Sequence, residues 1–522
     1  MNRRWGLASG PGFARRARRW ACGLALACTA SPAHAQEPTT PSPSPSAAPG
    51  PPPAAPAPEP APPPPTVTSS IPETEATPPA KKNPPGDVGR FELGSYGRVQ
   101  VASDGRGGTG RQANVVTHGT RIDEDSYAEI ELRREDTFAG DIKSKVVTTL
   151  ALFPPFFHFS GDMSNAIAVR NLYAQATYGR LTLWGGSRMY RGDDIYLLDW
   201  WPLDNQNTVG GGAGVSLPSD TVVAAHVGLQ RLDNSYQYEQ IPVVSPYGFG
   251  ATNVTLLDRP RTIETLKITQ FFRNDAKHHY LASDSAGLKA IVYGELHELP
   301  AGVYQDQTTQ QQLPYRADSG FLVGGELAYW TGERDTFVQL FVRHARGLAA
   351  YDPLEDPTTY ANDKTTSGSS ETLLALGGNW EHGMFGLLGG AYLRFFRDGD
   401  PAATSMNKFD EGTMVLRPQL FLGDNWGLAL EGSFQERRYA VLDPATDQPL
   451  TAQEWRGGVI PYFSPAGRGS YKRPQLRLIY AITARNAGAR ALYPAQDVFA
   501  QRQVEHYLGL GVEWWFNSSS YP

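Results

Sequence analysis

The sequence predicts an all-β fold, a transmembrane antiparallel β-barrel, and three observations support this prediction. Short segments in which apolar and polar residues alternate recur from residue 88 onward, and Gly, Asp and Asn separate them. Mean hydropathy is −0.39, and no run after residue 35 approaches the roughly 18 apolar residues that a spanning helix needs. The final segment alternates as well and ends in aromatic residues, a pattern typical of the closing strand of such barrels.

Residues 1–35 are predicted to form an export signal that is cleaved. A basic region with six arginines precedes a short apolar run, and an A-x-A cleavage motif ends at Ala35. A lipoprotein signal at Cys28 is the alternative, but such signals usually have Leu three residues earlier, where this chain has Ala25. Both cysteines, Cys22 and Cys28, lie in this segment, so the mature chain is expected to have no disulfide and no reactive thiol.

Cleavage also changes the charge of the chain. Removing six Arg and no acidic residue takes the formal net charge from −6 to −12. An acidic chain binds nucleic acid and anionic lipid surfaces poorly, so no nucleic-acid partner is expected.

Residues 36–87 are predicted to be a disordered, Pro-rich linker. Of the 42 prolines in the chain, 20 lie in this segment. Such a composition cannot bury enough apolar surface to fold, and it favours a semi-rigid, partly polyproline spacer. Two interpretations stay open: a linker with no binding role, or a tether that contacts peptidoglycan or another periplasmic partner.

Residues 88–522 are predicted to form the barrel domain. Within a segment the apolar residues share one parity, and the charged and amide-bearing residues, with several tyrosines, share the other, as in a β-strand whose two faces meet different surroundings. The apolar positions include Phe91, Leu93, Val99, Val101, Ile130, Leu132 and Leu172, and the opposite positions include Glu92, Tyr96, Arg98, Tyr127, Glu129, Asn171 and Tyr173. A soluble sandwich shows the same alternation, so this pattern alone does not select the barrel.

The length and the end of this domain favour the barrel. Its 435 residues suit 16 to 18 strands, at roughly 24 to 27 residues for each strand with its connection. A barrel of that size encloses an aqueous lumen. In the last strand one face carries Leu508, Leu510, Val512, Trp514 and Phe516, and the other carries Glu513 and Trp515.

The sequence contains no motif that predicts catalysis. The motifs H-E-x-x-H, G-x-S-x-G and G-x-x-x-x-G-K-[ST] do not occur, and the glycine run 210–214 lacks the helical pattern that should follow a phosphate-binding loop. The pair His278 and His279 has no acidic or His partner at ligand spacing, which favours an exposed loop over a metal site. We therefore expect no enzymatic activity, no cofactor and no metal.

The most informative segment is 189–204, with the sequence MYRGDDIYLLDWWPLD. It is too long and too rich in paired aromatic and acidic residues for a simple turn. Carboxylate and Arg side chains hydrogen-bond sugar hydroxyls, and Trp and Tyr rings pack on the apolar face of a pyranose. The segment thus suggests a long loop that contacts carbohydrate; the plainer interpretation is that its side chains pack on one another inside a barrel wall.

Segment 189–204 also resembles, without a gap, the inward-folded third loop of the maltoporins and the related sucrose porins. The resemblance extends to Arg170 and to the segments 95–98, 121–129, 181–188, 417–418 and 509–516. It implies an 18-stranded, trimeric barrel in the outer membrane with a constriction loop. Through such a barrel oligosaccharides diffuse passively along an aromatic slide flanked by polar tracks.

The resemblance also assigns roles to individual residues. The residues that match the slide are Tyr96, Tyr127 and Trp515, and Trp201 matches the constriction aromatic. The residues that match the polar tracks are Arg98, Arg121, Glu129, Arg170, Asp194 and Asp199, and Tyr196 stands where a His is usual. Two later slide positions depart from the family, because Val323 and Gly412 stand where aromatics are expected; Phe321 or Phe409 would be the substitutes.

Three functions remain open. The first is a sugar-selective outer-membrane porin for maltodextrin-like or other oligosaccharides. The second is a porin of the same shape for a different small solute. The third is a secreted all-β carbohydrate-binding protein, adhesin or enzyme.

Deleting residues 37–85 should leave folding and single-channel conductance nearly unchanged, because a disordered Pro-rich segment contributes no core. Heat-modifiable gel mobility and bilayer conductance of the deletion variant measure this. Loss of the folded barrel would mean that the segment plugs or templates the pore.

Overall fold

The computed structural model describes residues 89–518, except 153–166, 246, 249, 275–285, 332–335, 353–356, 358–363, 400–405 and 444–445. The predicted export signal, residues 1–35, and the predicted linker, residues 36–87, lie outside the described residues. Both therefore stay predictions.

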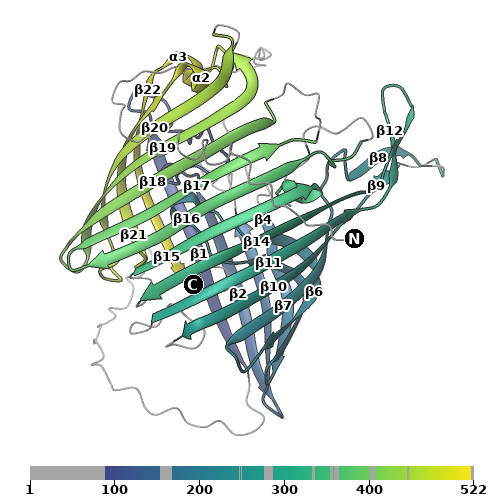
Figure 1. The fold of residues 1–522 in the computed structure, drawn as a ribbon, viewed down its shortest axis with the longest axis horizontal. Coiled ribbons are helices and arrows are strands. Elements are labelled where there is room, and N and C mark those ends of the chain that lie inside the picture. Colours follow the sequence, from purple (N-terminus) through teal and green to yellow (C-terminus); the bar gives the residue numbers. More distant parts are fainter. Residues whose placement is uncertain are drawn as a thin grey trace, which may run out of the picture.

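Eighteen strands form one closed antiparallel barrel, which confirms the predicted fold class (Figure 1). Each strand pairs with the next along the chain, and β1 pairs with β22 to close the ring. The strands are β1 (Arg90–Ser103), β2 (Tyr127–Phe138), β3 (Ile142–Leu152), β4 (Ile167–Tyr178), β5 (Leu181–Arg191), β6 (Asn205–Ser216), β7 (Thr221–Gln230), β10 (Arg261–Asn274), β11 (Ala286–Leu299), β14 (Asp318–Thr331), β15 (Thr336–Gly347), β16 (Ser370–His382), β17 (Phe385–Arg397), β18 (Lys408–Leu422), β19 (Trp426–Asp443), β20 (Gln448–Phe463), β21 (Gln475–Arg485) and β22 (Val504–Phe516).

The predicted strand parity is also confirmed. In β1, Phe91 and Val101 point outward and are 73% and 70% exposed, whereas Tyr96 points inward and is 1% exposed. The same belt of exposed apolar side chains continues around the outer wall. An apolar outer face and a polar inner face is the arrangement of a barrel that spans a lipid bilayer.

The predicted closing strand is in place. β22 lies between β21 and β1, and its register sets Trp515 opposite Tyr96 and Glu513 opposite Arg98. The inward residues of the last strand are therefore neighbours of the inward residues of the first.

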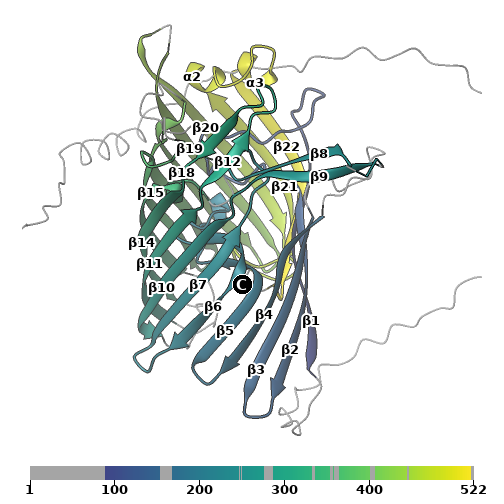
Figure 2. The same ribbon diagram turned by 90° about the vertical axis from the view of Figure 1, so that its right-hand side faces the viewer.

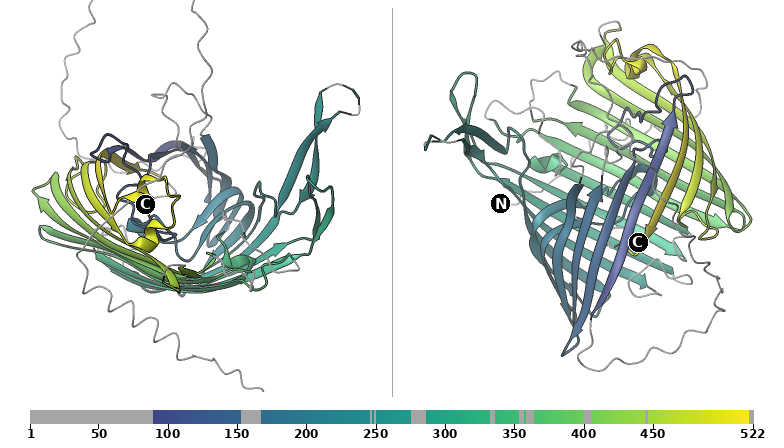
Figure 3. Two further views of the ribbon diagram at one scale, coloured as in Figure 1. Left: turned by 90° about the horizontal axis from the view of Figure 1, so that it is seen from above. Right: turned by 180° about the vertical axis from the view of Figure 1, so that it is seen from behind.

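The two ends of the barrel differ (Figure 2). One end carries short turns, in which Asp141, Gly179 and Gly383 adopt positive φ angles. The other end, the loop end, carries the small elements η3 (Tyr196–Leu198), η4 (Leu348–Ala350), α2 (Ala487–Arg490), α3 (Val498–Gln501) and the hairpins β8 (Tyr238–Val244) with β9 (Ala251–Asp258) and β12 (Gly302–Gln305) with β13 (Gln312–Tyr315). The β8–β9 hairpin projects away from the barrel wall (Figure 3).

One connection at the turn end is longer than the other turns. Residues 464–474 join β20 to β21 and make an 11-residue connection where the described neighbouring turns have two to four residues.

In the part of the chain that the structure describes, no helix has the length and apolar character needed to cross a membrane.

Candidate functional site

Residues 192–204 run from β5 to β6 through the interior of the barrel, as expected for the constriction loop. The backbone N–H of Ile195 donates to the carbonyl of Trp200 at 2.8 Å, which closes the loop around η3. Asp199 ends that turn in the left-handed region, with φ 45°. The loop's apolar side chains share one buried cluster with the opposite wall, where β15 to β18 contribute Phe341, Leu373, Leu388 and Val415.

Two glycines in the opposite wall make room for the tip of this loop. A Cβ atom on Gly390 would lie 2.8 Å from Cγ2 of Ile195, and one on Gly377 would lie 3.2 Å from Cγ1. The first distance is closer than carbon atoms tolerate, so the loop fits the wall because position 390 has no side chain.

Lysines from the wall hold both ends of the loop. Lys289 on β11 forms an ion pair with Asp193, and Nζ of Lys267 on β10 lies 2.6 Å from Asp204 Oδ2. Burial alone would raise the pKa of Asp193, but Lys289 holds it below its ordinary value. The loop is therefore fixed at its tip by packing and at its ends by charge.

A second loop, residues 104–126, also folds into the interior, and no pattern in the sequence predicted it. The backbone N–H of Thr117 donates to Glu411 Oε2 on β18 at 3.0 Å. The backbone N–H of Arg121 donates to the carbonyl of Leu197 at 3.2 Å. The two inward loops thus contact each other across the lumen.

Glu513 on β22 joins four elements at one buried carboxylate. It accepts hydrogen bonds from Arg473 Nε at 2.8 Å and from Arg477 Nη2 at 2.5 Å. Tyr196 Oη donates to it at 2.8 Å, and Arg121 Nη2 lies 3.3 Å away. Both inward loops, the connection between β20 and β21, and β21 itself therefore meet at this residue.

A second group of charges adjoins the first. Glu124 Oε2 lies 2.8 Å from Arg121 Nε and 3.3 Å from Arg98 Nε. Asp199 lies 3.5 Å from Arg98 and 4.0 Å from Arg121. Burial raises the pKa of Glu124 to about 7 against the opposing effect of the arginines. Burial alone would also raise the pKa of Asp199, but Arg121 and Arg98 hold it below its ordinary value.

The three predicted slide aromatics lie in one row with Tyr96 in the centre. The ring centroid of Tyr96 is 6.1 Å from that of Tyr127 and 6.5 Å from that of Trp515, and the second pair is stacked with 18° between the ring planes. Arg98 and Arg121 donate to Tyr96 Oη at 2.8 Å and 2.6 Å. Tyr127 and Trp515 are half-buried, so they offer more ring surface to the lumen than Tyr96 does.

Glu129 and Arg170 extend the polar row past Tyr127. Tyr127 Oη donates to Glu129 Oε1 at 2.5 Å, and Arg170 Nη1 lies 2.7 Å from the same oxygen. Glu129 Oε2 is buried and has no hydrogen-bond partner among the described residues. This atom is an acceptor that a bound hydroxyl or water would satisfy.

Trp201 and Asp194 belong to the constriction loop itself. Trp201 is 6% exposed, and the guanidinium carbon of Arg191 lies 3.7 Å from its ring centroid. Asp194 is half-buried. Arg191 thus covers one face of the Trp201 ring.

The structure shows where the two residues offered as substitutes for the later slide positions lie. Phe321 and Val323 share the outward parity of β14 and are 40% and 51% exposed on the outer wall, so Phe321 is the wrong substitute. Phe409 on β18 points inward but is only 9% exposed, less than the half-buried Trp515, and the guanidinium carbon of Arg437 lies 4.4 Å from its ring centroid. The aromatic row with partly open faces is therefore short.

Residues 464–474 form a third segment inside the barrel, at the turn end. The ring centroid of Tyr471 is 5.3 Å from that of Tyr196 and 6.0 Å from that of Phe337 on β15. Arg473 Nη2 donates to Tyr196 Oη at 2.6 Å, and its guanidinium carbon lies 4.1 Å from the ring centroid of Trp515. The constriction is thus built from both ends of the barrel.

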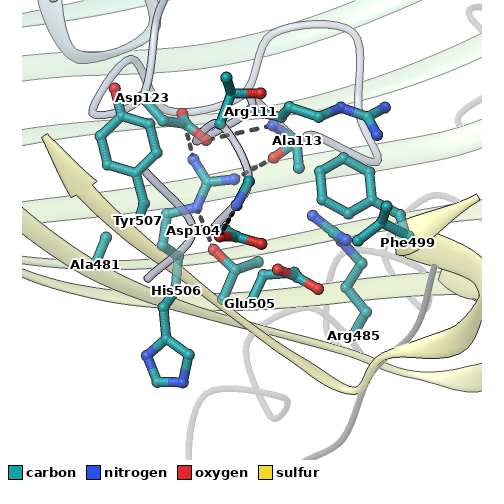
Figure 4. Close-up of a pocket in the computed structure, with 15 residues that line it drawn as sticks. Asp104, Arg111, Ala113, Asp123, Ala481, Arg485, Phe499, Glu505, His506 and Tyr507 are labelled. Carbon is teal, nitrogen blue, oxygen red and sulfur yellow. Dashed lines mark hydrogen bonds and ion pairs between the residues drawn. The ribbon is translucent and has the colours of Figure 1, made fainter. Parts of the chain in front are cut away.

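A cavity of about 270 Å³ lies toward the loop end, between loop 104–126, β20 and the connection that carries α3 (Figure 4). Arg456 donates to Asp123 Oδ1 at 2.7 Å and to Glu454 Oε1 at 2.7 Å. Burial raises the pKa of Asp123 to about 6, although Arg456 opposes this. Arg485, Glu505 and other charged side chains complete a vestibule with both signs of charge.

Sequence analysis missed four residues of the central network: Glu124, Arg473, Arg477 and Glu513. The inward parity of Glu513 beside Trp515 was the available signal, whereas nothing in the sequence indicated that the connection holding Arg473 folds inward.

Among the described residues no group of three His, Cys, Asp or Glu side chains can hold a metal ion. His278 and His279 lie outside the described residues.

Comparison with known proteins gives one family. The model of the LamB porin family matches residues 91–516. No curated protein sequence matches the chain. Among solved structures, Acinetobacter baumannii OccAB4 is 9% identical, with 82% of this chain and 97% of that chain covered and a TM-score of 0.39. OmpT, an outer membrane protein of Vibrio cholerae in a trimer form, is 10% identical over 82% and 100%, with a TM-score of 0.35.

Replacing Gly390 with Val should raise single-channel conductance. The new side chain would collide with Ile195, and overpacking of about 1–3 kcal/mol is relieved if the loop tip leaves the wall. Bilayer recordings measure the conductance. The control is Gly432→Val, where a Cβ meets no atom within 4 Å; equal conductance of both variants would contradict the anchoring of the loop.

Proposed function

The chain belongs to the LamB porin family, and we propose that this outer-membrane channel admits oligosaccharides selectively by passive diffusion. In this proposal the row Tyr127, Tyr96 and Trp515 is the slide, and the charged residues beside it are the polar tracks. The proposal concerns the sugar and these roles; the barrel and its outer-membrane location follow from the family and the fold.

The observation that supports this proposal most strongly is the alternation of ring faces and charge pairs along the constriction. A sugar ring has apolar C–H faces and a rim of hydroxyl groups. Each ring contact should contribute on the order of 1 kcal/mol, which retains a sugar for a short time and still lets it leave.

The hydrogen-bond arrangement of the tracks suits exchange with hydroxyl groups. Arg98 and Arg121 both pair with Glu124, so a hydroxyl that enters can replace one partner while the other persists. An arrangement in which every group keeps a partner avoids the cost of an unpaired buried charge. The unsatisfied acceptor on Glu129 adds a place where a hydroxyl donor would gain a bond.

The short aromatic row favours short oligosaccharides over long ones. Phe409 and Trp201 are buried, beneath Arg437 and Arg191, whereas Tyr127 and Trp515 are half-buried. Fewer open rings mean fewer sugar units held at one time. A porin for a different small solute is the alternative, and solute-specific current block separates the two.

We also propose that the barrels assemble as trimers, which rests on the family. Native mass measurement of the detergent-extracted protein should give three chains per particle. A particle of one chain at every concentration would refute this.

Trp201→Ala should raise ion conductance and weaken sugar block, because it removes the ring that supports Arg191 at the constriction. Trp515→Ala should weaken block by roughly tenfold, equivalent to about 1.4 kcal/mol, with little change in conductance. Current-noise or block analysis with maltodextrins of increasing length measures both.

The matched control is Trp514→Ala, on the same strand with its side chain at an outward position. It should bind sugars as the parent does. If Trp201→Ala and Trp515→Ala bind every tested oligosaccharide like the parent, the assignment of the slide is wrong although the barrel is right.

A further inference from the structure

A cavity of about 330 Å³ lies in the lumen beside the base of the constriction loop. Side chains from β3, β4, β5, β7 and β10 line it, together with Gly192 of the loop. Arg191 lines this cavity and also stacks on the ring of Trp201, so the cavity lies beside the constriction. A solute in the channel therefore passes it.

The charged residues that line this cavity are all basic. Lys145, Arg188, Arg191 and Lys267 line it, and none of the described lining residues is Asp or Glu. Asp204 pairs with Lys267 and does not line the cavity. The cavity is thus an electropositive place inside a chain with a negative net charge.

Arg188 is held by ring faces instead of by a carboxylate. Its guanidinium carbon lies 4.8 Å from the ring centroid of Trp184, 5.1 Å from that of Tyr173 and 5.8 Å from that of Tyr190. Within the described part of the chain it makes no ion pair. A guanidinium that stacks on rings keeps its N–H edges available for a planar or tetrahedral anion.

The glycine run of β6 makes this stacking geometry possible. The inward positions of that strand include Gly210, Gly212 and Gly214, and a Cβ on Gly212 would lie 2.2 Å from Cζ2 of Trp184. Without side chains there, the Trp184 ring lies against the wall and Arg188 lies over the ring. The run therefore has a packing role.

Lys145 is another cation of the lining, and in the described part of the chain no carboxylate lies within ion-pair distance of it. It stands opposite Glu135 in the register of β2 and β3, but Glu135 is engaged by Arg90 and Arg133 at 2.9 Å each. The slide differs, since Arg98 and Arg121 there lie against Glu124 and Asp199. Cations with no carboxylate at ion-pair distance favour an anionic ligand.

We propose that this cavity, the basic subsite, binds the carboxylate or phosphate group of an acidic sugar. Arg188 and Lys145 contact the anion, and the faces of Tyr173 and Tyr190 pack on the sugar ring. The inference rests on the proposed function and deepens it, because it names acidic sugars as a class of solute that this channel retains.

The test compares sugars in bilayers that contain the full mature protein at low salt, where charge effects are least screened. The probes are trigalacturonate, glucose 6-phosphate and neutral maltotriose. The parent should bind at least one acidic probe more tightly than maltotriose. Arg188→Gln and Lys145→Gln should each weaken that binding by roughly tenfold and change maltotriose binding by less than about twofold.

The matched control is Lys143→Gln, which removes a cation two residues along the same strand and outside the lining. It should leave all three probes unchanged. Loss for trigalacturonate alone identifies a carboxylate ligand, and loss for glucose 6-phosphate alone identifies a phosphate ligand.

Three results would overturn the basic subsite. The first is that Arg188→Gln and Lys145→Gln change no acidic probe. The second is that Lys143→Gln has the same effect, which would indicate only the overall potential of the lumen. The third is that neutral and acidic probes weaken together. Failure of the proposed function looks different, since maltotriose would then not block the parent at all.

Discussion

The carboxylate of Glu513 is the contact on which the arrangement of the lumen depends. Arg121 brings the first inward loop to it, Tyr196 brings the constriction loop, and Arg473 and Arg477 bring the segment between β20 and β21 and the wall. Removing one partner of a buried charge pair leaves the other charges uncompensated, which is strongly destabilising. Three segments far apart in the sequence thus hold one another in place through a residue of the closing strand.

The barrel wall supports these segments by leaving space. Gly390 accommodates the tip of the constriction loop, and Gly212 accommodates Trp184. The lumen therefore contains two surfaces of different chemistry, the slide and the basic subsite. Along the slide every cation faces a carboxylate, whereas in the basic subsite Arg188 faces only aromatic rings. A neutral hydroxyl rim suits the first surface and an anion suits the second.

Much of the fold follows from local rules, and part of the site does not. Strand parity requires only that two faces differ, so the outward Phe91 and the inward Tyr96 could be predicted, and the family resemblance located the constriction loop. The inward path of residues 104–126 depends on partners such as Glu411, which lies about three hundred positions away along the chain. No period or spacing encodes such a contact, and the same holds for Arg473. Of the two residues offered as substitutes for the later slide positions, Phe321 was wrong, because it shares the outward parity of Val323.

The segment 464–474 makes the channel unequal at its two ends. At the loop end lies a vestibule with both signs of charge, whereas at the turn end residues 464–474 pack against the constriction loop through Tyr471. A passive pore cannot shift the equilibrium between two compartments, because both directions share the same bound states. It can, however, bind and release a solute faster at one end than at the other. The rate constants for entry and exit of one solute therefore differ between the two ends of the channel.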